Sequence, residues 1–423
     1  MSNRPEQPSA RPYRDGHRTS HWGVLVGSVL CVLALVVTAL YGWRIGWFAS
    51  MTGNDAAASS ATADAARNTP QQLARSAAPK PDPSPASKAH RMVNAMDMDT
   101  RIGQLVMAPL YAGNAPASLS SLIADRHVGS VLIIGKWTGG VASVRAAADQ
   151  LQGYAPGDNR LIISTDQEGG WVQHLTGPGF DRMPTAVDQG TMSTNQLRQS
   201  ASVWGSQMAA AGINVDLAPV LGTVVVNRAA NAPIGALYRD FGLDAEGNAA
   251  HGTAFVQGMA DAGVQSAIKH YPGLGAVTDN TDFTADGILD TTTTLDGTEI
   301  KAFDTTIDKA DPAMVMMALA TYQAIDPNDP AVFSSIIIDG HLRGDLGYDG
   351  VVISDSMSAA AVSAYDTTQL GVKLVEAGGD LVCIGDTNYV VPILDGLSTR
   401  AASDPAFANK VTRSEEHTSE LQS

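Results

Sequence analysis

Polar side chains stand at the ends of several short apolar runs in this chain. Asp166 and Asp355 each close such a run, Lys269 and His270 close another, and Asp216 lies within a fourth. Carboxylates can act as nucleophiles or as proton-transfer groups, and Lys and His can donate hydrogen bonds to a bound molecule. Any one of these aspartates could equally cap a helix or pair with a cation. Whether these side chains form a functional site therefore depends on whether the fold brings the ends of the apolar runs together.

Eight apolar runs alternate with helix-like segments after residue 89. Because the runs are continuously apolar, they predict parallel strands covered on both faces, and eight of them over about 300 residues favour a closed (β/α)8 barrel of the TIM type. An open α/β sheet remains the alternative. In such a barrel the carboxyl ends of the strands form one rim, which carries the site. The predicted strands cover 104–109, 129–134, 161–166, 213–218, 264–269, 313–318, 350–355 and 380–384, with amphipathic helices at 195–211, 245–262 and 367–377.

The composition narrows the range of partners and cofactors. A formal net charge of −16 argues against a nucleic-acid partner, because the chain would repel a phosphate backbone. The two cysteines, Cys31 and Cys383, cannot build a disulfide framework or a cysteine metal site, and the nine histidines show no metal-ligand spacing. We therefore predict no metal and no cofactor.

The N-terminal part predicts a membrane tether. Residues 22–48 contain an apolar run long enough to cross a bilayer as a helix, with tryptophans near both ends. Four arginines precede it and only Arg44 follows closely, which predicts a cytoplasmic tail at 1–21 and a single-pass cell-membrane protein whose remaining chain lies outside. A cleaved signal peptide is the competing interpretation. Residues 49–88, rich in Ala, Ser and Pro, are expected to form a linker.

The last residues, 413–423, read RSEEHTSELQS and look like the in-frame translation of a sequencing-adapter oligonucleotide. We treat them as an artefact and expect the natural chain to continue differently after Thr412. The predicted barrel domain then covers 89–412, and a second domain could follow it.

Three motifs carry a resemblance to a known family. DQEGGWVQ at 166–173, KHYPGLG at 269–275 and GVVISDS at 350–356 look like motifs of glycoside hydrolase family 3, in particular its bacterial β-N-acetylglucosaminidase branch. The similarity runs from about residue 99 to residue 388. It implies a single barrel that removes terminal β-linked N-acetylglucosamine, often from cell-wall fragments, by a retaining mechanism.

The resemblance also assigns roles to individual residues. Asp355 matches the family's catalytic nucleophile at the end of the seventh strand. Asp166, Lys269 and His270 match residues that hydrogen-bond the sugar hydroxyls. Arg239 matches a sugar-binding arginine, although the preceding segment carries two extra residues relative to the usual spacing.

The chain departs from the family pattern at three positions. A second family arginine is His174 here, and a histidine between two glycines is Leu274. The family's acid/base sequence Asp-Ser-His aligns with 280–282, which reads Asn-Thr-Asp, so the histidine that protonates the leaving group is replaced by Asp282.

Because the family's histidine is replaced at this position, Asp282 becomes the candidate acid/base. A retaining glycosidase needs a nucleophilic carboxylate and a second proton-transfer group about 5 Å away, and a carboxyl group with a raised pKa can serve as the second. Repulsion from Asp279, Asp286 or Asp290 could raise the pKa of Asp282. Alternatively, 279–282 is a surface loop without a catalytic role.

Three functions follow as hypotheses. The first is an extracytoplasmic β-N-acetylhexosaminidase that acts on cell-wall or related glycans. The second is a β-glucosidase-type member whose acid/base lies in a missing second domain. The third is a membrane-anchored protein that binds glycans without cleaving them.

Overall fold

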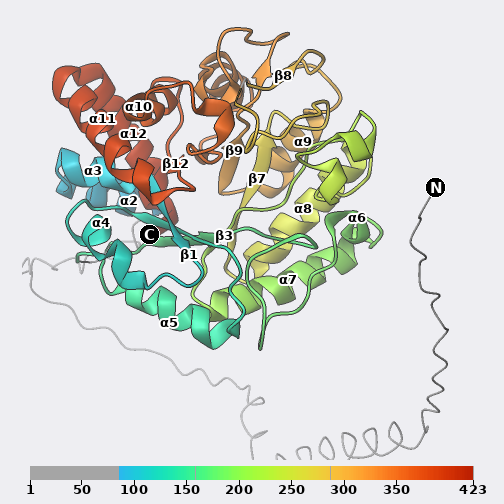
Figure 1. The fold of residues 1–423 in the computed structure, drawn as a ribbon, viewed down its shortest axis with the longest axis horizontal. Helices are drawn as coiled ribbons and strands as arrows, with labels where there is room; N and C mark the ends of the chain where they lie inside the picture. Colours follow the sequence, from blue (N-terminus) through green and yellow to red (C-terminus); the bar gives the residue numbers. More distant parts are fainter. Residues whose placement is uncertain (1–84, 158, 286, 423) are drawn as a thin grey trace, which may run out of the picture. The chain divides into compact units, whose positions relative to one another are not determined.

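The computed structural model describes residues 85–157, 159–285 and 287–422 (Figure 1). The predicted cytoplasmic tail, the predicted transmembrane helix at 22–48 and nearly all of the predicted linker lie outside the described residues. Pro85 to Lys88, which composition places in the linker, already form the first turn of helix α2 (Pro85–Ala95). Within the described part of the chain, no helix is both long and apolar enough to cross a membrane.

A parallel eight-stranded sheet forms the centre of the fold. The strands are neighbours in the order of the sequence, and a bridge between Ile353 and Leu381 joins the last two, so that the sheet closes on itself. The predicted barrel and each of its eight strands are thereby confirmed. The strands are β1 (Val106–Tyr111), β2 (Ser130–Ile134), β3 (Ile162–Thr165), β6 (Val215–Asp216), β7 (Gln265–Tyr271), β9 (Met314–Met317), β11 (Val351–Ser354) and β12 (Val382–Cys383).

Helices follow the strands and surround the barrel (Figure 1). The three predicted helices are present as α7 (Thr194–Ala210), α8 (Ala245–Asp261) and α10 (Thr367–Glu376). Residues that favour helix N-termini begin all three helices. Ser193 and Gln196 form a capping box at α7, Asp244 caps α8, and Asp366 caps α10. The remaining helices are α3 (Met98–Gln104), α4 (Ser120–Ala124), α5 (Gly140–Gln152), α6 (Ala186–Gln189), α9 (Lys301–Ala310), the π-helix η5 (Ile336–Asp345), α11 (Val390–Ser403) and α12 (Pro405–Gln422), with short 3-10 turns between them.

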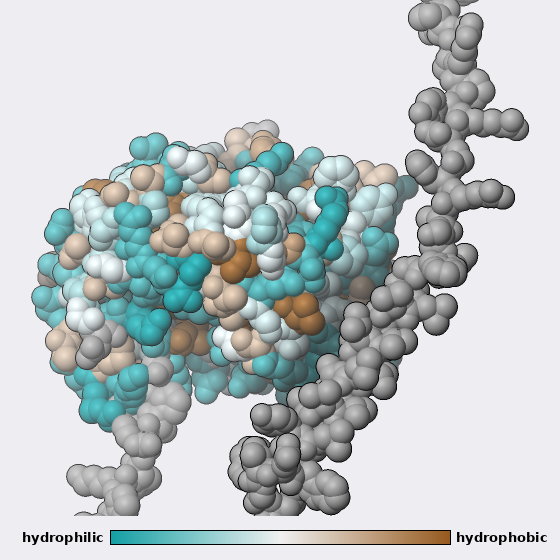
Figure 2. All heavy atoms as spheres, turned by 90° about the horizontal axis from the view of Figure 1, so that it is seen from below, coloured by the Kyte–Doolittle hydropathy of each residue, from teal (hydrophilic) through white to brown (hydrophobic). Residues whose placement is uncertain are grey.

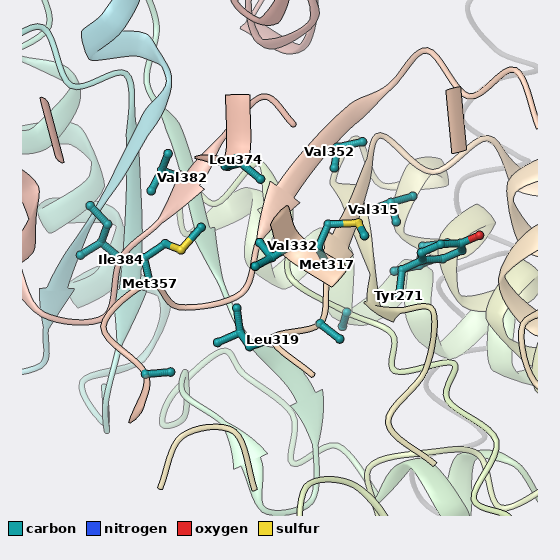
Figure 3. Close-up of a cluster of buried hydrophobic side chains, with 14 of the residues drawn as sticks. Tyr271, Val315, Met317, Leu319, Val332, Val352, Met357, Leu374, Val382 and Ile384 are labelled. Carbon is teal, nitrogen blue, oxygen red and sulfur yellow. The ribbon is translucent and has the colours of Figure 1, made fainter. Parts of the chain in front are cut away.

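Alternate residues of the strands enter two separate cores. Met107, Leu132, Met316 and Ile353 belong to a cluster that fills the barrel interior, whereas their sequence neighbours face the helices. Figure 3 shows side chains of the outer layer from β9, β11 and β12 together with Leu374 of α10. Because the interior is filled, the barrel is no pore, and the strand residues open to a ligand are those at its rim. On the face shown in Figure 2, hydrophobic residues form small separate patches among hydrophilic ones.

The segment at 413–422, interpreted above as an artefact, continues helix α12. This helix packs against α2, α3, α10 and α11, and Leu421 contacts the cluster inside the barrel. The buried positions of its last turns are nevertheless polar, with Glu415 fully buried and one of its carboxylate oxygens unpaired. Burial raises the pKa of Glu415 well above its usual value. Part of this polarity is matched, because Ser414 donates a hydrogen bond to the Gly379 carbonyl oxygen and His417 pairs with Asp380, but Glu415 keeps an unpaired oxygen.

Candidate active site

A cavity of about 500 Å³ opens at the carboxyl ends of the barrel strands. It collects residues that follow different strands, as the barrel geometry requires. All the predicted site residues line it: Asp166, Arg239, Lys269, His270, Asp282 and Asp355, together with His174 and Leu274.

The floor of the cavity is a network of opposite charges centred on Lys269. Its ammonium nitrogen lies 2.5 Å from Asp166 Oδ1 and 2.7 Å from Glu168 Oε1, and its side chain is only 1% exposed. Arg239 donates two hydrogen bonds to Glu168, at 2.8 and 2.9 Å, and a third to the Pro233 carbonyl oxygen at 2.8 Å. The ammonium group is therefore held by Asp166 and Glu168, and Asp216 is not among its ion-pair partners.

Ionisation in this network is set by the competition between burial and pairing. Burial opposes the charge of Glu168, but Arg239 and Lys269 hold the pKa of its carboxyl well below the usual range. Burial likewise opposes the charge of Lys269, but Asp166 and Glu168 raise its pKa above the usual value. Fixed charges of both signs are thus available to orient the hydroxyl groups of a ligand.

The turn after β3 brings Asp166 and Glu168 together. Strand β4 (Gln167–Gly169) pairs with β5 (Val172–Gln173) in a tight antiparallel hairpin. At Gly169 the backbone has φ +97°, and an added Cβ would lie 2.3 Å from the Pro184 carbonyl oxygen, so no other residue fits without a shift. The two glycines of the DQEGG motif therefore serve backbone geometry.

Asp216 lies beneath this turn, fully buried. It accepts a hydrogen bond from the Gln167 main-chain N–H at 3.0 Å, between the two carboxylates that bind Lys269. Burial raises the pKa of Asp216 to about 8. Asp216 thus supports the turn from below and does not line the cavity.

Asp355 follows β11 and faces the cavity. Its Oδ1 accepts the Ser356 main-chain N–H at 2.7 Å, and its Oδ2 lies 3.7 Å from His270 Nε2. Burial, and then the charge of Asp282, raise the pKa of Asp355 to about 6. Burial, reinforced by Arg239 and Lys269, lowers the pKa of His270 well below its usual value, so this imidazole is neutral at physiological pH.

A loop after β7 carries Asp282 to the same cavity. The Asn280 side chain accepts the Asp282 N–H at 2.9 Å, and the carbonyl oxygens of Thr281 and Asp282 accept the N–H groups of Ala361 and Ala360 at 3.0 and 3.4 Å. The loop is therefore tied to the segment that follows Asp355. It is not a detached surface turn, and its docking places a second carboxylate opposite Asp355.

The origin of the Asp282 pKa shift differs from the sequence prediction. Burial, and then Asp166, raise the pKa of Asp282, and this carboxyl also interacts with Asp355. Neither Asp279 nor Asp290 raises it; Asp290 is occupied by hydrogen bonds from Thr292 and Thr293. Residue 286 lies outside the described part. Proximity in sequence was a poor guide here, because the loop turns toward Asp166 and Asp355.

Glu168 is the residue that the sequence analysis missed. It lies two positions after Asp166 in an extended segment, and such residues share one face. That spacing, read together with Lys269, was the available signal. His174, which replaces a family arginine, has its Nε2 3.8 Å from Asp166 Oδ2, so a basic side chain still faces this carboxylate.

A comparison with models of known protein families identifies the family of this chain. Residues 97–416 match the model of the glycosyl hydrolase family 3 N-terminal domain. The chain belongs to this family. The family assignment made from the three motifs is thereby confirmed, and so is its enzyme class, that of a glycoside hydrolase.

Several known proteins are similar to this chain over most of its length. A β-hexosaminidase of Alkalilimnicola ehrlichii is 31% identical over 300 residues, covering 68% of this chain and 83% of the relative. A secreted glycosyl hydrolase of Arthroderma benhamiae is 32% identical, covering 70% and 84%. The crystal structure of a β-N-acetylhexosaminidase from Beutenbergia cavernae superimposes with a TM-score of 0.74 at 41% identity, covering 76% of this chain and 97% of that chain.

Proposed function

We propose that this family 3 hydrolase removes terminal β-linked N-acetylhexosamine residues from glycans by a retaining mechanism. The observation that carries the proposal is the pair Asp355 and Asp282, two carboxylates that line one cavity above a floor of fixed charges. The choice of sugar is supported by the relatives, which include a β-N-acetylhexosaminidase 41% identical to this chain.

The charged floor would bind the terminal sugar. Asp166 can accept hydrogen bonds from hydroxyl groups, and Lys269, Arg239 and His270 can donate them. Because Lys269 and Arg239 are each held by carboxylates, they are oriented before the substrate arrives. A preorganised floor of this kind positions the anomeric carbon toward Asp355.

The reaction would proceed in two steps. Asp355 attacks the anomeric carbon while Asp282 gives its proton to the departing glycosidic oxygen, which leaves as an alcohol and a covalent glycosyl-enzyme. Asp282, now ionised, then takes a proton from water, and the resulting hydroxide attacks the anomeric carbon and releases Asp355. Each step inverts the anomeric centre, so the product keeps the β configuration.

The electrostatics of the pair suit these roles. Two interacting carboxyl groups lose their protons in separate steps, so that at weakly acidic pH the pair holds one proton. The N–H of Ser356 favours the negative charge on Asp355, whereas Lys269 and Arg239 favour ionisation of both carboxyl groups. The first step requires that the remaining proton lie on Asp282.

Hydrolysis of paired aryl glycosides tests the proposal. The full chain should cleave aryl N-acetyl-β-glucosaminide much faster than the β-glucoside without the 2-acetamido group, and NMR should show the β-anomer as the first product. An Asp355→Asn variant, purified identically, should lose activity by several orders of magnitude, because no other residue would form the glycosyl-enzyme. A preference for the glucoside would favour a β-glucosidase. Sugar binding without turnover would favour a glycan-binding protein.

We also propose that the enzyme acts outside the cell membrane on cell-wall or related glycans, tethered by a helix at 22–48. The support is the sequence alone: one long apolar run with an excess of arginine on its N-terminal side. Reporters fused after residue 50 should be active only on the outer side. Protection of the barrel from protease in intact spheroplasts would contradict this topology.

A further inference from the structure

An exposed aromatic side chain stands next to the proposed acid/base. Phe283 is 82% exposed and yet lines the cavity. Its main-chain N–H donates a hydrogen bond to the Asn280 carbonyl oxygen at 3.1 Å, in the same turn that fixes Asp282. The ring is therefore held at the mouth of the cavity by an ordered turn.

Leu237 adds a second apolar group to the lining, 37% exposed. It ends the 3-10 turn η3 (Gly235–Leu237), and the next residue, Tyr238, has φ +54°, a left-handed conformation that is unusual for a residue other than glycine. Arg239 then reaches Glu168. The segment that anchors the sugar-binding arginine thus also fixes Leu237, and the surrounding structure maintains its unusual backbone.

The cavity is therefore polar at its floor and carries two exposed apolar side chains in its lining, one of them on the residue that follows Asp282. If Asp282 protonates the glycosidic oxygen, the group beyond that oxygen must lie on the Asp282 side. Phe283, as its direct neighbour, borders that space. A sugar ring suits such a surface, because one face of the ring presents C–H groups to an aromatic or aliphatic side chain while the hydroxyl groups at its edge remain in water.

We propose that Phe283, with Leu237, forms a subsite for a pyranose leaving group, so that the enzyme prefers oligosaccharides to simple glycosides. This inference rests on the proposed function, because the orientation of the leaving group follows from the role of Asp282. The occupant is the second sugar of a β-linked chain, bound through its face.

Binding to the full chain carrying Asp355→Asn tests the subsite without turnover. Isothermal titration calorimetry should show that the β-1,4-linked dimer of N-acetylglucosamine binds about tenfold more tightly than the monosaccharide, the size of effect expected for one such contact. Adding Phe283→Ala should bring the ratio of the two affinities close to one, and Phe283→Trp should preserve it.

Trp171 provides the matched control. It is also strongly exposed, at 76%, but it lies in the turn between β4 and β5 and does not line the cavity. Trp171→Ala in the same background should keep the affinity ratio. If the monosaccharide binds but Phe283→Ala leaves the ratio unchanged, the subsite is overturned while the proposed function stands. If neither sugar binds at millimolar concentration, the proposed function fails and the subsite fails with it.

Discussion

Arg239 and Glu168 form a buried ion pair joined by two hydrogen bonds, and Lys269 binds the same carboxylate. Arg239 precedes α8, Glu168 follows β3, and Lys269 belongs to β7. One carboxylate therefore connects three consecutive parts of the barrel at its rim. The side chains of Glu168 and Lys269 are 3% and 1% exposed, so this carboxylate and this ammonium group are shielded from water.

Glu168→Gln should destabilise the protein strongly at neutral pH. The substitution leaves two buried cations with fewer partners, and breaking a buried pair costs about 3–5 kcal/mol. Because the folded-state pKa of Glu168 is lowered, its contribution is complete above the unfolded value of about 4.3 and is lost gradually as the pH falls from there toward the much lower folded-state pKa. Urea unfolding at pH 7 and about pH 3 should therefore show a difference between wild type and variant that shrinks in acid.

Asp149→Asn is the control for this prediction. Asp149 pairs with Arg145 on the surface of α5, where both side chains are more than half exposed. Such a pair contributes at most about 1 kcal/mol. Equal effects of the two substitutions would show that the network at the rim contributes no more than an ordinary surface pair.

Glu415→Leu should stabilise the protein, and more so at high pH. Glu415 is buried with an unpaired oxygen, and its raised pKa means that the folded state holds it protonated. The unfolded chain releases this proton above about pH 4.3, so wild-type stability falls as the pH rises through the window up to the folded-state pKa. The leucine removes that dependence.

Thermal melts at pH 5 and pH 8 check this. The gain in Tm should be larger at pH 8, and Glu416→Leu, at the neighbouring position whose side chain is 37% exposed, should change Tm little. A lower Tm for Glu415→Leu at both pH values would mean that the end of α12 does not lie on the barrel as described.

Most of the barrel could be predicted from sequence, because continuously apolar strands and capped helices are local signals. Asp166, Lys269 and Asp355 could be placed at one rim for the same reason: each closes a strand. The partners of Asp282 could not be predicted, because they depend on main-chain hydrogen bonds from Ala360 and Ala361 to the loop that carries Asp282. Such main-chain bonds do not depend on residue type and leave no signal in the sequence. The burial of Asp216 could not be predicted either, because it depends on how the turn at 166–169 packs above this residue.

The pH dependence of kcat/KM should be bell-shaped, with its acidic limb set by ionisation of Asp355. The second proton of the pair leaves Asp282, so ionisation of Asp282 sets the alkaline limb, and the charge already present on Asp355 opposes this ionisation. Asp282→Asn removes the second ionisation, so the alkaline limb should disappear while the acidic limb remains. Activated aryl substrates make the residual activity measurable between pH 4 and pH 8. An alkaline limb that persists in Asp282→Asn would show that the second ionisation belongs to another group.

Asp282→Ala should slow substrates in proportion to how much their leaving groups need protonation. A strongly acidic phenol leaves an aryl glycoside without being protonated, whereas the alcohol that leaves an alkyl glycoside or a disaccharide needs a proton. The variant should therefore lose about 10²–10⁴-fold of its activity on alkyl glycosides and disaccharides, and much less on the activated aryl glycosides. Azide should restore turnover of the activated substrates, because this anion can attack the glycosyl-enzyme without general-base assistance, and it should yield the β-glycosyl azide. Asp279→Ala is the matched control on the same loop, since Asp279 does not line the cavity. A weak loss of activity that is equal for all leaving groups, without azide rescue, would show that another group is the acid/base. Asp282 would then only help to shape the cavity.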